Sequence, residues 1–394
     1  MDNWFHRIVE SHHEYAKAWK QRTGGKVVGY FCAYVPEELI YATGALPVRV
    51  MGSLRPTELA EAHIPSMYCS FCRDVLAEGL AGSYDYLDGV VMAKSCIHLE
   101  HAFECWGLSV TTPFKYYLPM PWVLDSPEAK KYYLTELKRF KDNLEEWSGK
   151  AVTEQALDKS IKTHNRYRQL MHQLYDLRKS NPPLVSGLEA AEIALVSMLS
   201  DKAEFLPHLE KAITELPASP NRPKSGARLM IAGGENYDLE LFKAMESLGA
   251  NVVIDELCMG SRYFWNPVLI PSLLSETDSA TRRDGEGEGE GASQDRLEAL
   301  ADRYLCRPPC PAKATPMPRY EHLLNLVKDF KAQGVLLIQQ KFCSPHALDI
   351  PDLSRFLMEH NIPSYTFELD ITLAKGQLRT RTEAFLEMLE LEPV

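Results

Sequence analysis

Three cysteines occupy positions at which a protein could bring thiolates together. Cys343 follows the apolar run 335–338. Cys96 follows the run 86–92, and Cys69 precedes a segment with helical spacing. Strand ends in open α/β sheets converge where ligands bind, and a thiolate is stabilised at a helix N-terminus. We therefore expect a thiolate site assembled from distant parts of the chain.

The chain carries nine cysteines, and their spacing leaves the kind of metal open. No CxxC…CxxC repeat marks a zinc ribbon or a ferredoxin. Three thiolates suit an iron–sulfur cluster with one iron open to a non-cysteine ligand. They equally suit a zinc ion with an open position.

Two further segments offer weaker signals. Gly233 and Gly234 lie at a strand-to-helix turn that could hold an anion. They lack both the dinucleotide fingerprint and the P-loop pattern, so we do not expect an ATP- or NAD-binding chain. Cys258 and Arg262 follow the next strand, and they either face the same cleft or pack in the interior.

Proline and glycine mark two irregular segments. Cys306 and Cys310 are separated by Arg-Pro-Pro. Because prolines hold a segment extended, we expect this stretch to cross the surface rather than to bind metal. The acidic, glycine-rich run 281–294 cannot bury enough apolar surface to order itself, and it predicts an exposed loop.

Composition excludes several classes of protein. The 394 residues include 43 Lys and Arg against 54 Asp and Glu, a net charge of −11, which argues against nucleic-acid binding. No apolar run approaches the roughly 20 residues that span a bilayer. The first residues are polar and amphipathic, without the apolar core of a signal peptide. We expect a cytoplasmic protein, in which the cysteines are not paired as disulfides.

Alternating strand and helix patterns predict an α/β fold with two parallel sheets. Short apolar runs predict four strands in the first half and four in the second: 26–31, 46–50, 86–92, 113–123, 228–232, 251–255, 335–338 and 365–369. A helix is expected over 352–360, and another over 1–22.

Changes in composition divide the chain into three regions. We predict a first α/β domain over 1–126, carrying Cys69 and Cys96, and a helical region over 127–218. The proline-rich stretch 217–226 reads as a linker. A second α/β domain then covers 219–394, and two sheets that face each other would enclose a cleft at which the cysteines meet.

The whole pattern resembles the benzoyl-CoA reductase and 2-hydroxyacyl-CoA dehydratase family, and specifically the smaller iron–sulfur subunit of the ATP-dependent reductases. The order and spacing of the motifs carry this resemblance across nearly the whole chain: VPEELIYATGALPVRV (35–50), YCSFCR (68–73), YDYLDGVVMAKSC (84–96), DELCMGSRYFW (255–265), RYLCRPPCP (303–311), KFCSPHALDIPDL (341–353) and ELDITLAKGQLRTRTEAFLEML (368–389).

The resemblance implies a fold and a cofactor. Subunits of this family have two flavodoxin-like or Rossmann-like domains joined by a helical region. They hold a 4Fe–4S cluster through three cysteines, which correspond here to Cys69, Cys96 and Cys343. Cys72 competes with the first of these as a ligand, and Cys105 competes weakly with the second.

The resemblance also implies partners and a reaction. The family pairs two homologous subunits, and a separate ATP-hydrolysing activator drives electrons to low potential. Reductases then reduce an aromatic acyl-CoA with electrons from ferredoxin. Dehydratases recycle a single electron through a ketyl radical. Where dehydratases often have an acidic residue after the second cysteine, this chain has Ile97 and His98.

We expect the reductase reaction, with His98 and His101 as catalytic proton donors, because ring reduction consumes protons. Three alternatives stay open. The chain could be a subunit of a 2-hydroxyacyl-CoA dehydratase, an electron-relay or double-cluster protein of the same fold, or a zinc-binding α/β scaffold.

Overall fold

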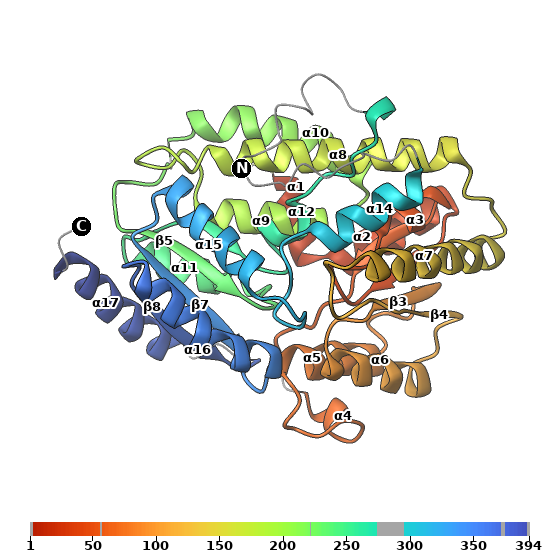
Figure 1. Cartoon of the computed structure of the whole chain (residues 1–394), viewed down its shortest axis with the longest axis horizontal. Coiled ribbons are helices and arrows are strands. Elements are labelled where there is room, and N and C mark those ends of the chain that lie inside the picture. Colours follow the sequence, from red (N-terminus) through yellow and green to blue (C-terminus); the bar gives the residue numbers. More distant parts are fainter. Residues whose placement is uncertain (1–2, 56, 221, 274–294, 372–374, 392–394) are drawn as a thin grey trace.

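The computed structural model describes residues 3–55, 57–220, 222–273, 295–371 and 375–391. Within them, eight strands form two four-stranded parallel sheets (Figure 1). The first sheet contains β1 (Val27–Tyr30), β2 (Leu46–Arg49), β3 (Gly89–Ala93) and β4 (Phe114–Leu118). The second contains β5 (Arg228–Gly233), β6 (Asn251–Glu256), β7 (Gly334–Gln340) and β8 (Ser364–Leu369). The predicted α/β fold with two parallel sheets is confirmed, whereas the predicted loop 281–294 lies outside the described residues.

Both sheets have the same strand order. It is β2-β1-β3-β4 in the first and β6-β5-β7-β8 in the second, and every pairing is parallel. The connections that follow the two central strands of each sheet therefore run toward opposite edges of that sheet. Such a switch point leaves a crevice at the carboxyl ends of those strands, where ligands bind in open α/β sheets.

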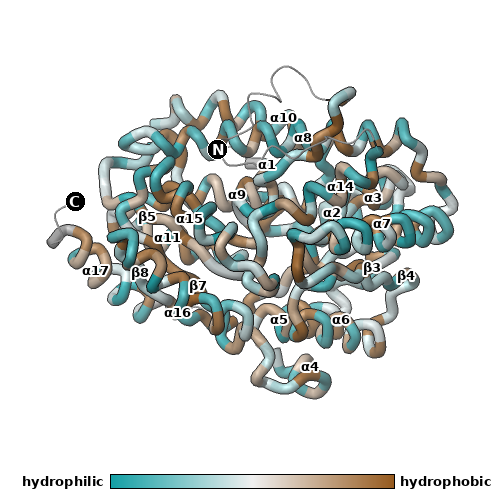
Figure 2. The backbone as a smooth tube through the Cα atoms, viewed as in Figure 1, coloured by the Kyte–Doolittle hydropathy of each residue, from teal (hydrophilic) through white to brown (hydrophobic). Residues whose placement is uncertain are grey.

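Burial differs between the two edges of each sheet, because the edge strands β2 and β6 are fully buried. All five residues of β3 are buried, and so are all four of β1, because helices cover both faces of a parallel sheet. The edge strands β4 and β8 leave several residues half-buried or exposed. Figure 2 shows hydrophilic residues gathered on outer helices such as α7 (Pro127–Ser148).

The remaining elements are helices that cover the sheets and join them. They are α1 (Asn3–Glu10), α2 (His12–Thr23), α3 (Glu37–Ala42), α4 (Glu58–Glu61), α5 (Ser70–Leu80), α6 (Ile97–Ser109), α8 (Glu154–Asp176), α9 (Gly187–Ser197), α10 (Lys202–Glu215), α11 (Glu240–Ser247), α12 (Ser261–Phe264), α14 (Arg296–Cys306), α15 (Met317–Phe330), α16 (Ser344–Glu359) and α17 (Lys375–Leu391).

Two helix predictions need correction. The expected single helix over 1–22 is two helices, which meet at Ser11. The helix expected over 352–360 begins at Ser344. Pro345 lies in its first turn, where the missing N–H costs no hydrogen bond, so this proline starts the helix rather than blocking it.

The second half of the chain returns to the first sheet before completing its own. Val268, Ile270 and residues of α14 are buried in the core around β1 and β3, and α14 packs against α7. This return carries the segment after α14 to the carboxyl ends of both sheets.

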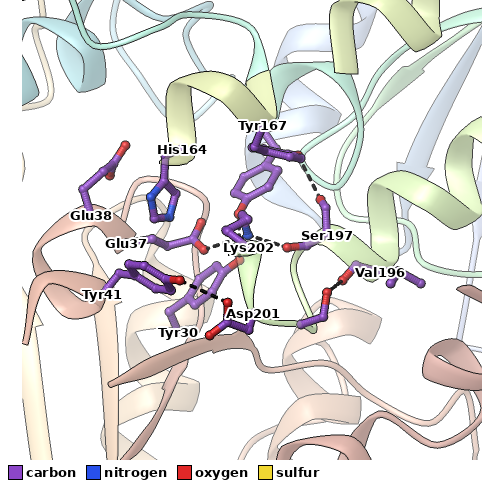
Figure 3. Close-up of polar contacts among 12 residues, drawn as sticks. Tyr30, Glu37, Glu38, Tyr41, His164, Tyr167, Val196, Ser197, Asp201 and Lys202 are labelled. Atoms are coloured by element: carbon purple, nitrogen blue, oxygen red, sulfur yellow. Dashed lines mark hydrogen bonds and ion pairs between the residues drawn. The ribbon is translucent and has the colours of Figure 1, made fainter. Parts of the chain in front are cut away.

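A buried polar network ties the helical layer to the first sheet (Figure 3). The Lys202 ammonium lies 3.5 Å from the Glu37 carboxylate and donates to the Ser197 carbonyl. Tyr41 donates to Asp201 over 3.0 Å. Buried charges are retained in proteins when they are paired and hydrogen-bonded, as they are here, so we regard this network as structural.

Candidate active site

Each of the three cysteines singled out in the sequence is the N-cap of a helix. Cys69 precedes α5, Cys96 precedes α6 and Cys343 precedes α16. All three line one cavity of about 70 Å³. The positive ends of three helix dipoles therefore lie at one site, which favours thiolates and an anionic ligand.

Strand topology explains this convergence. Cys96 follows β3 and Cys343 follows β7, each a central strand beside its sheet's switch point. Gly234 follows β5 and lines the same cavity. A Cβ at Gly234 would lie 3.1 Å from the His346 ring, so the loop passes close to the start of α16.

Hydrogen bonds across the cavity rim connect the two sheets. The Ser70 hydroxyl donates to Gln340 Oε1 over 2.6 Å, and Gln340 Nε2 donates to the Glu235 carbonyl over 2.8 Å. Arg73 donates to Asp370 over 3.0 Å. These contacts hold α5 against the carboxyl end of the second sheet.

Cys69 is the thiolate of the set. The Cys69 and Cys72 sulfurs lie 3.3 Å apart, and the hydrogen bond between them lowers the pKa of Cys69 to about 5 against the opposing effect of burial. A contact with His98 lowers this pKa further. The pKa of Cys72 is raised in turn by the same bond and by burial.

Cys96 and Cys343 differ from Cys69. Burial raises the pKa of Cys96 well above its usual value and the pKa of Cys343 to about 12. Both are therefore thiols at neutral pH, and a metal would have to displace their protons. His346 Nδ1 lies 3.4 Å from the Cys343 sulfur, and burial lowers the pKa of His346 to about 3, so its ring is neutral.

The three N-cap cysteines fit the ligand set of an iron–sulfur cluster. Among the described residues, no three His, Cys, Asp or Glu side chains are arranged to hold one metal ion. A cluster binds each thiolate through a separate iron, so its ligands line a cavity without meeting at a point. Two buried groups of this lining, His346 Nε2 and Arg307 Nε, have no hydrogen-bond partner among the described residues.

The two histidines predicted as proton donors lie beside the cavity, outside its lining. His98 stacks on Tyr68, with ring centroids 4.6 Å apart, and its Nδ1 is buried without a partner among the described residues. His101 Nδ1 lies 2.5 Å from the Tyr68 hydroxyl. Cys105 lies further along α6, where its thiol faces the His63 carbonyl at 3.7 Å.

The expectation that the segment after Cys306 crosses the surface is wrong. Arg307 is only 2% exposed, and its guanidinium donates to the Ala33 and Arg262 carbonyls. Cys310 lines the cavity. The prolines hold this segment extended, as expected, but α14 delivers it to the interior.

Cys32 and Cys258 also line the cavity, beside Cys72 and Cys310. Sequence reasoning left Cys258 open and gave Cys32 no role. The signal was available, because Cys32 follows β1 in the way that Cys96 follows β3.

Exposed apolar side chains flank each of the three N-cap cysteines. Met67, Ile97 and Phe342 lie within two residues of them and are 66%, 54% and 44% exposed. Large exposed apolar side chains that gather near a site are typical of interaction surfaces.

Comparison with known proteins identifies a family with this sequence pattern. The family model described as 2-hydroxyglutaryl-CoA dehydratase, D-component, matches residues 32–389. The chain is similar to the (R)-phenyllactyl-CoA dehydratase beta subunit of Clostridium sporogenes, at 25% identity over 98% of each chain. It is 28% identical to the (R)-2-hydroxyglutaryl-CoA dehydratase beta subunit of Acidaminococcus fermentans, over 93% of each.

A component of a reductase is similar to a comparable degree. One of the subunits of benzoyl-CoA reductase from Thauera aromatica is 25% identical over 95% of this chain and 94% of its own. These relatives are all enzyme subunits, and they span both reactions that the sequence resemblance implies. The match covers the second sheet, three of the four strands of the first and all three N-cap cysteines, and the chain belongs to the 2-hydroxyglutaryl-CoA dehydratase, D-component family.

Proposed function

We propose that this chain is the iron–sulfur subunit of an ATP-dependent, ferredoxin-linked reductase of aromatic acyl-CoA thioesters of the benzoyl-CoA type. Cys69, Cys96 and Cys343 hold its 4Fe–4S cluster. The observation that carries the proposal is that three cysteines from distant parts of the chain, each the N-cap of its own helix, line one cavity.

The bound cluster would supply single electrons at low potential to the acyl-CoA. The protein contributes the environment of the ligands. Cys96 and Cys343 are half-buried, and the dipoles of α5, α6 and α16 stabilise the negative charge there. The Cys72 hydrogen bond holds the Cys69 sulfur in position and tunes its charge.

Ring reduction requires protons as well as electrons. His98 and His101 both contact Tyr68, which precedes Cys69 in the chain. This arrangement supports a proton path of imidazole and phenol groups along α6 toward the cavity. It favours the reductase reaction, because dehydration has no net need for added protons.

Electrons must arrive from partners. The chain has neither a P-loop nor a dinucleotide fingerprint, so ATP hydrolysis belongs to a separate activator. The exposed Met67, Ile97 and Phe342 beside the cysteines suit the docking of that activator, or of ferredoxin, close to the cluster. The enzyme, which we place in the cytoplasm, also contains a homologous larger subunit. No described helix is both apolar enough and long enough to span a bilayer.

The second candidate is a subunit of a 2-hydroxyacyl-CoA dehydratase. It is favoured by the matching family model and by the names of the Clostridium and Acidaminococcus relatives. The same cysteines and cavity would serve this reaction, in which the electron is recycled.

The cluster is tested on the protein alone. Protein prepared without oxygen should contain iron and acid-labile sulfide, and its dithionite-reduced form should give an electron paramagnetic resonance signal. Cys96→Ala and Cys343→Ala should lose the signal, while Cys105→Ala should keep it. Iron-free wild-type protein, or a full signal in Cys343→Ala, would refute the assignment.

The reaction is tested with the proposed partner subunits added to this chain. Benzoyl-CoA and (R)-2-hydroxyglutaryl-CoA are offered separately with ATP and reduced ferredoxin. The reductase should consume ATP and ferredoxin in proportion to product. A dehydratase should need both only to start, and that result would select the second candidate.

A further inference from the structure

A second, smaller hollow lies at the seam between the two sheets, beside the cavity that the three N-cap cysteines line. Its volume is about 20 Å³. Phe71 of α5 and Gln340 of β7 line both this side hollow and the cysteine cavity. The two spaces are therefore neighbours, and the side chains of these two residues form the wall between them.

The size and the lining of the side hollow suit water. A buried water needs about 10–15 Å³ and two to four polar partners. Polar residues in the lining include Ser70, Asn236, Asp238 and Asp370. The hollow has room for a water molecule and none for a substrate, so water is the ligand that it fits.

The side hollow meets solvent at Asp370 and is closed toward the cysteine cavity. The Asp370 side chain is 40% exposed, and it pairs with Arg73 over 3.0 Å and with Lys341 over 3.4 Å. Ser70 and Phe71, at the wall, are buried. Solvent water therefore has a way into the hollow, and the wall is what separates it from the cysteines.

The wall has a fixed part and a part that can move. The Phe71 ring packs under the Arg49 guanidinium, 5.6 Å from the ring centroid. Gln340 is held by two neutral hydrogen bonds: its Oε1 accepts from the Ser70 hydroxyl over 2.6 Å, and its Nε2 donates to the Glu235 carbonyl over 2.8 Å. Such bonds contribute little net free energy where water can replace them. Rotation of the Gln340 side chain is therefore the easiest way to join the two spaces.

A polar group waits for water on the inner side of the wall. Glu235 lines the cysteine cavity, and its Oε2 is buried with no hydrogen-bond partner among the described residues. Water that passes Gln340 can donate to this oxygen. Ring reduction takes up protons as well as electrons, and His98 and His101 lie outside the cavity lining, so water admitted here would bring protons to the place where they are used.

We propose that the side hollow is a water-filled entrance to the cysteine cavity and that Gln340 is the gate between them. The entrance supplies water and its protons by a route separate from the histidines of α6. Only the use of those protons rests on the proposed function, because the entrance and its gate belong to the chain itself, with or without a cluster.

A crystal structure of the metal-free wild-type chain tests the ligand without any substitution. An ordered water should lie in the side hollow, within hydrogen-bond distance of at least two of the polar residues that line it. A dry hollow, in a crystal that shows buried waters elsewhere in the chain, would overturn the proposal.

The gate is tested by the rate at which iodoacetamide alkylates Cys69 in the folded, metal-free chain. Mass spectrometry reads this rate against that of Cys306, an exposed cysteine in the same protein. Gln340→Ala should raise the relative rate about tenfold, as expected if two neutral hydrogen bonds hold the gate closed. Gln339→Ala is the matched control, because the preceding residue of β7 points to the opposite face of the sheet and should leave the rate unchanged.

A plug in the side hollow distinguishes this route from entry where Cys96 and Cys343 are half-buried. Ile371 lines the side hollow and not the cysteine cavity, and Ile371→Trp should fill the hollow. Added to Gln340→Ala, it should return the Cys69 rate to the wild-type value. Near-ultraviolet circular dichroism like that of wild type shows that each variant is folded.

Two results would overturn the gate: a Cys69 rate that Gln340→Ala leaves unchanged, or one that stays raised after the plug is added. Both measurements use metal-free protein, so either result leaves the proposed cluster and reaction standing. Wild-type protein that contains no iron when prepared without oxygen would overturn the proposed function and leave the entrance standing.

Discussion

The sulfurs of Cys69 and Cys72 lie 3.3 Å apart in a hydrogen bond that lowers the pKa of Cys69 and raises the pKa of Cys72. Cys69 is the N-cap of α5, and Cys72 lies within the first turn. Cys72 keeps its proton and Cys69 gives its proton up. Cys69 is therefore prepared to bind metal, and Cys72 supports it.

The first prediction concerns the pKa of Cys69 in the metal-free protein. Its pKa is about 5, chiefly because of its hydrogen bond with Cys72, so Cys72→Ala should raise the pKa toward the usual value for a thiol, which is about 8.5. The thiolate of Cys69 is followed as the ultraviolet absorbance of wild-type protein minus that of Cys69→Ser. The same difference is taken between Cys72→Ala and the double variant that also carries Cys69→Ser. The first difference should appear at lower pH than the second. Equal midpoints would show that the hydrogen bond does not set the pKa.

The second prediction concerns a buried ion pair behind the first sheet. Glu38 is fully buried, accepts from Arg168, and accepts from the Tyr304 hydroxyl over 2.8 Å. Glu38→Gln leaves the Arg168 charge uncompensated and should lower the free energy of unfolding by about 3–5 kcal/mol, measured by urea titration. Glu14→Gln removes an exposed pair with Lys17 and should change it by less than about 1 kcal/mol. Similar losses in the two variants would contradict this account.

The third prediction is a loss of stability in mild acid. Burial lowers the pKa of His164 to about 4 and that of His12 to about 4. The unfolded chain takes up these protons near pH 6.5 and the folded chain does not, so the free energy of unfolding should fall as the pH falls from about 6.5 to about 4. The loss should be on the order of 1–3 kcal/mol for each histidine.

A substitution at His164 separates its share of that effect. Its Nδ1 donates to the Ser160 carbonyl over 2.8 Å, and the ring lies near Glu37 and Glu38 (Figure 3). His164→Asn keeps a donor and removes the titrating group. Its unfolding free energy should depend less on pH between about 6.5 and 4 than that of wild type. An unchanged slope would assign the acid sensitivity to other groups.

The fourth prediction concerns the contact between the two sheets. Gln340 joins Ser70 of α5 to the Glu235 carbonyl after β5. Gln340→Leu removes both bonds and leaves the Glu235 carbonyl without this donor, so it should cost about 1–3 kcal/mol. It should also speed the release of iron to a chelator, because the cavity is held closed less firmly. Gln169→Leu, a matched change in α8, should alter neither the rate of iron release nor the free energy of unfolding by a comparable amount.

The sequence was sufficient for the two parallel sheets and for the expectation that Cys69, Cys96 and Cys343 meet at one cavity. Apolar runs of strand length, alternating with helical spacing, determine parallel sheets because each buried strand must be apolar on both faces. Cys96 and Cys343 could be identified because they follow such runs. The helix expected over 352–360 missed the first turns of α16, which begins at Ser344 with Pro345 in its first turn.

Only the tertiary structure decided which distant residues share the cavity. Cys310 reads as part of an extended surface segment, and it becomes a lining residue because α14 packs on the first sheet and carries the chain inward. Local pattern fixes an element and the face it buries, since both depend on near neighbours in the chain. The meeting of two sheets at their switch points depends on packing between segments hundreds of residues apart, which no local pattern records.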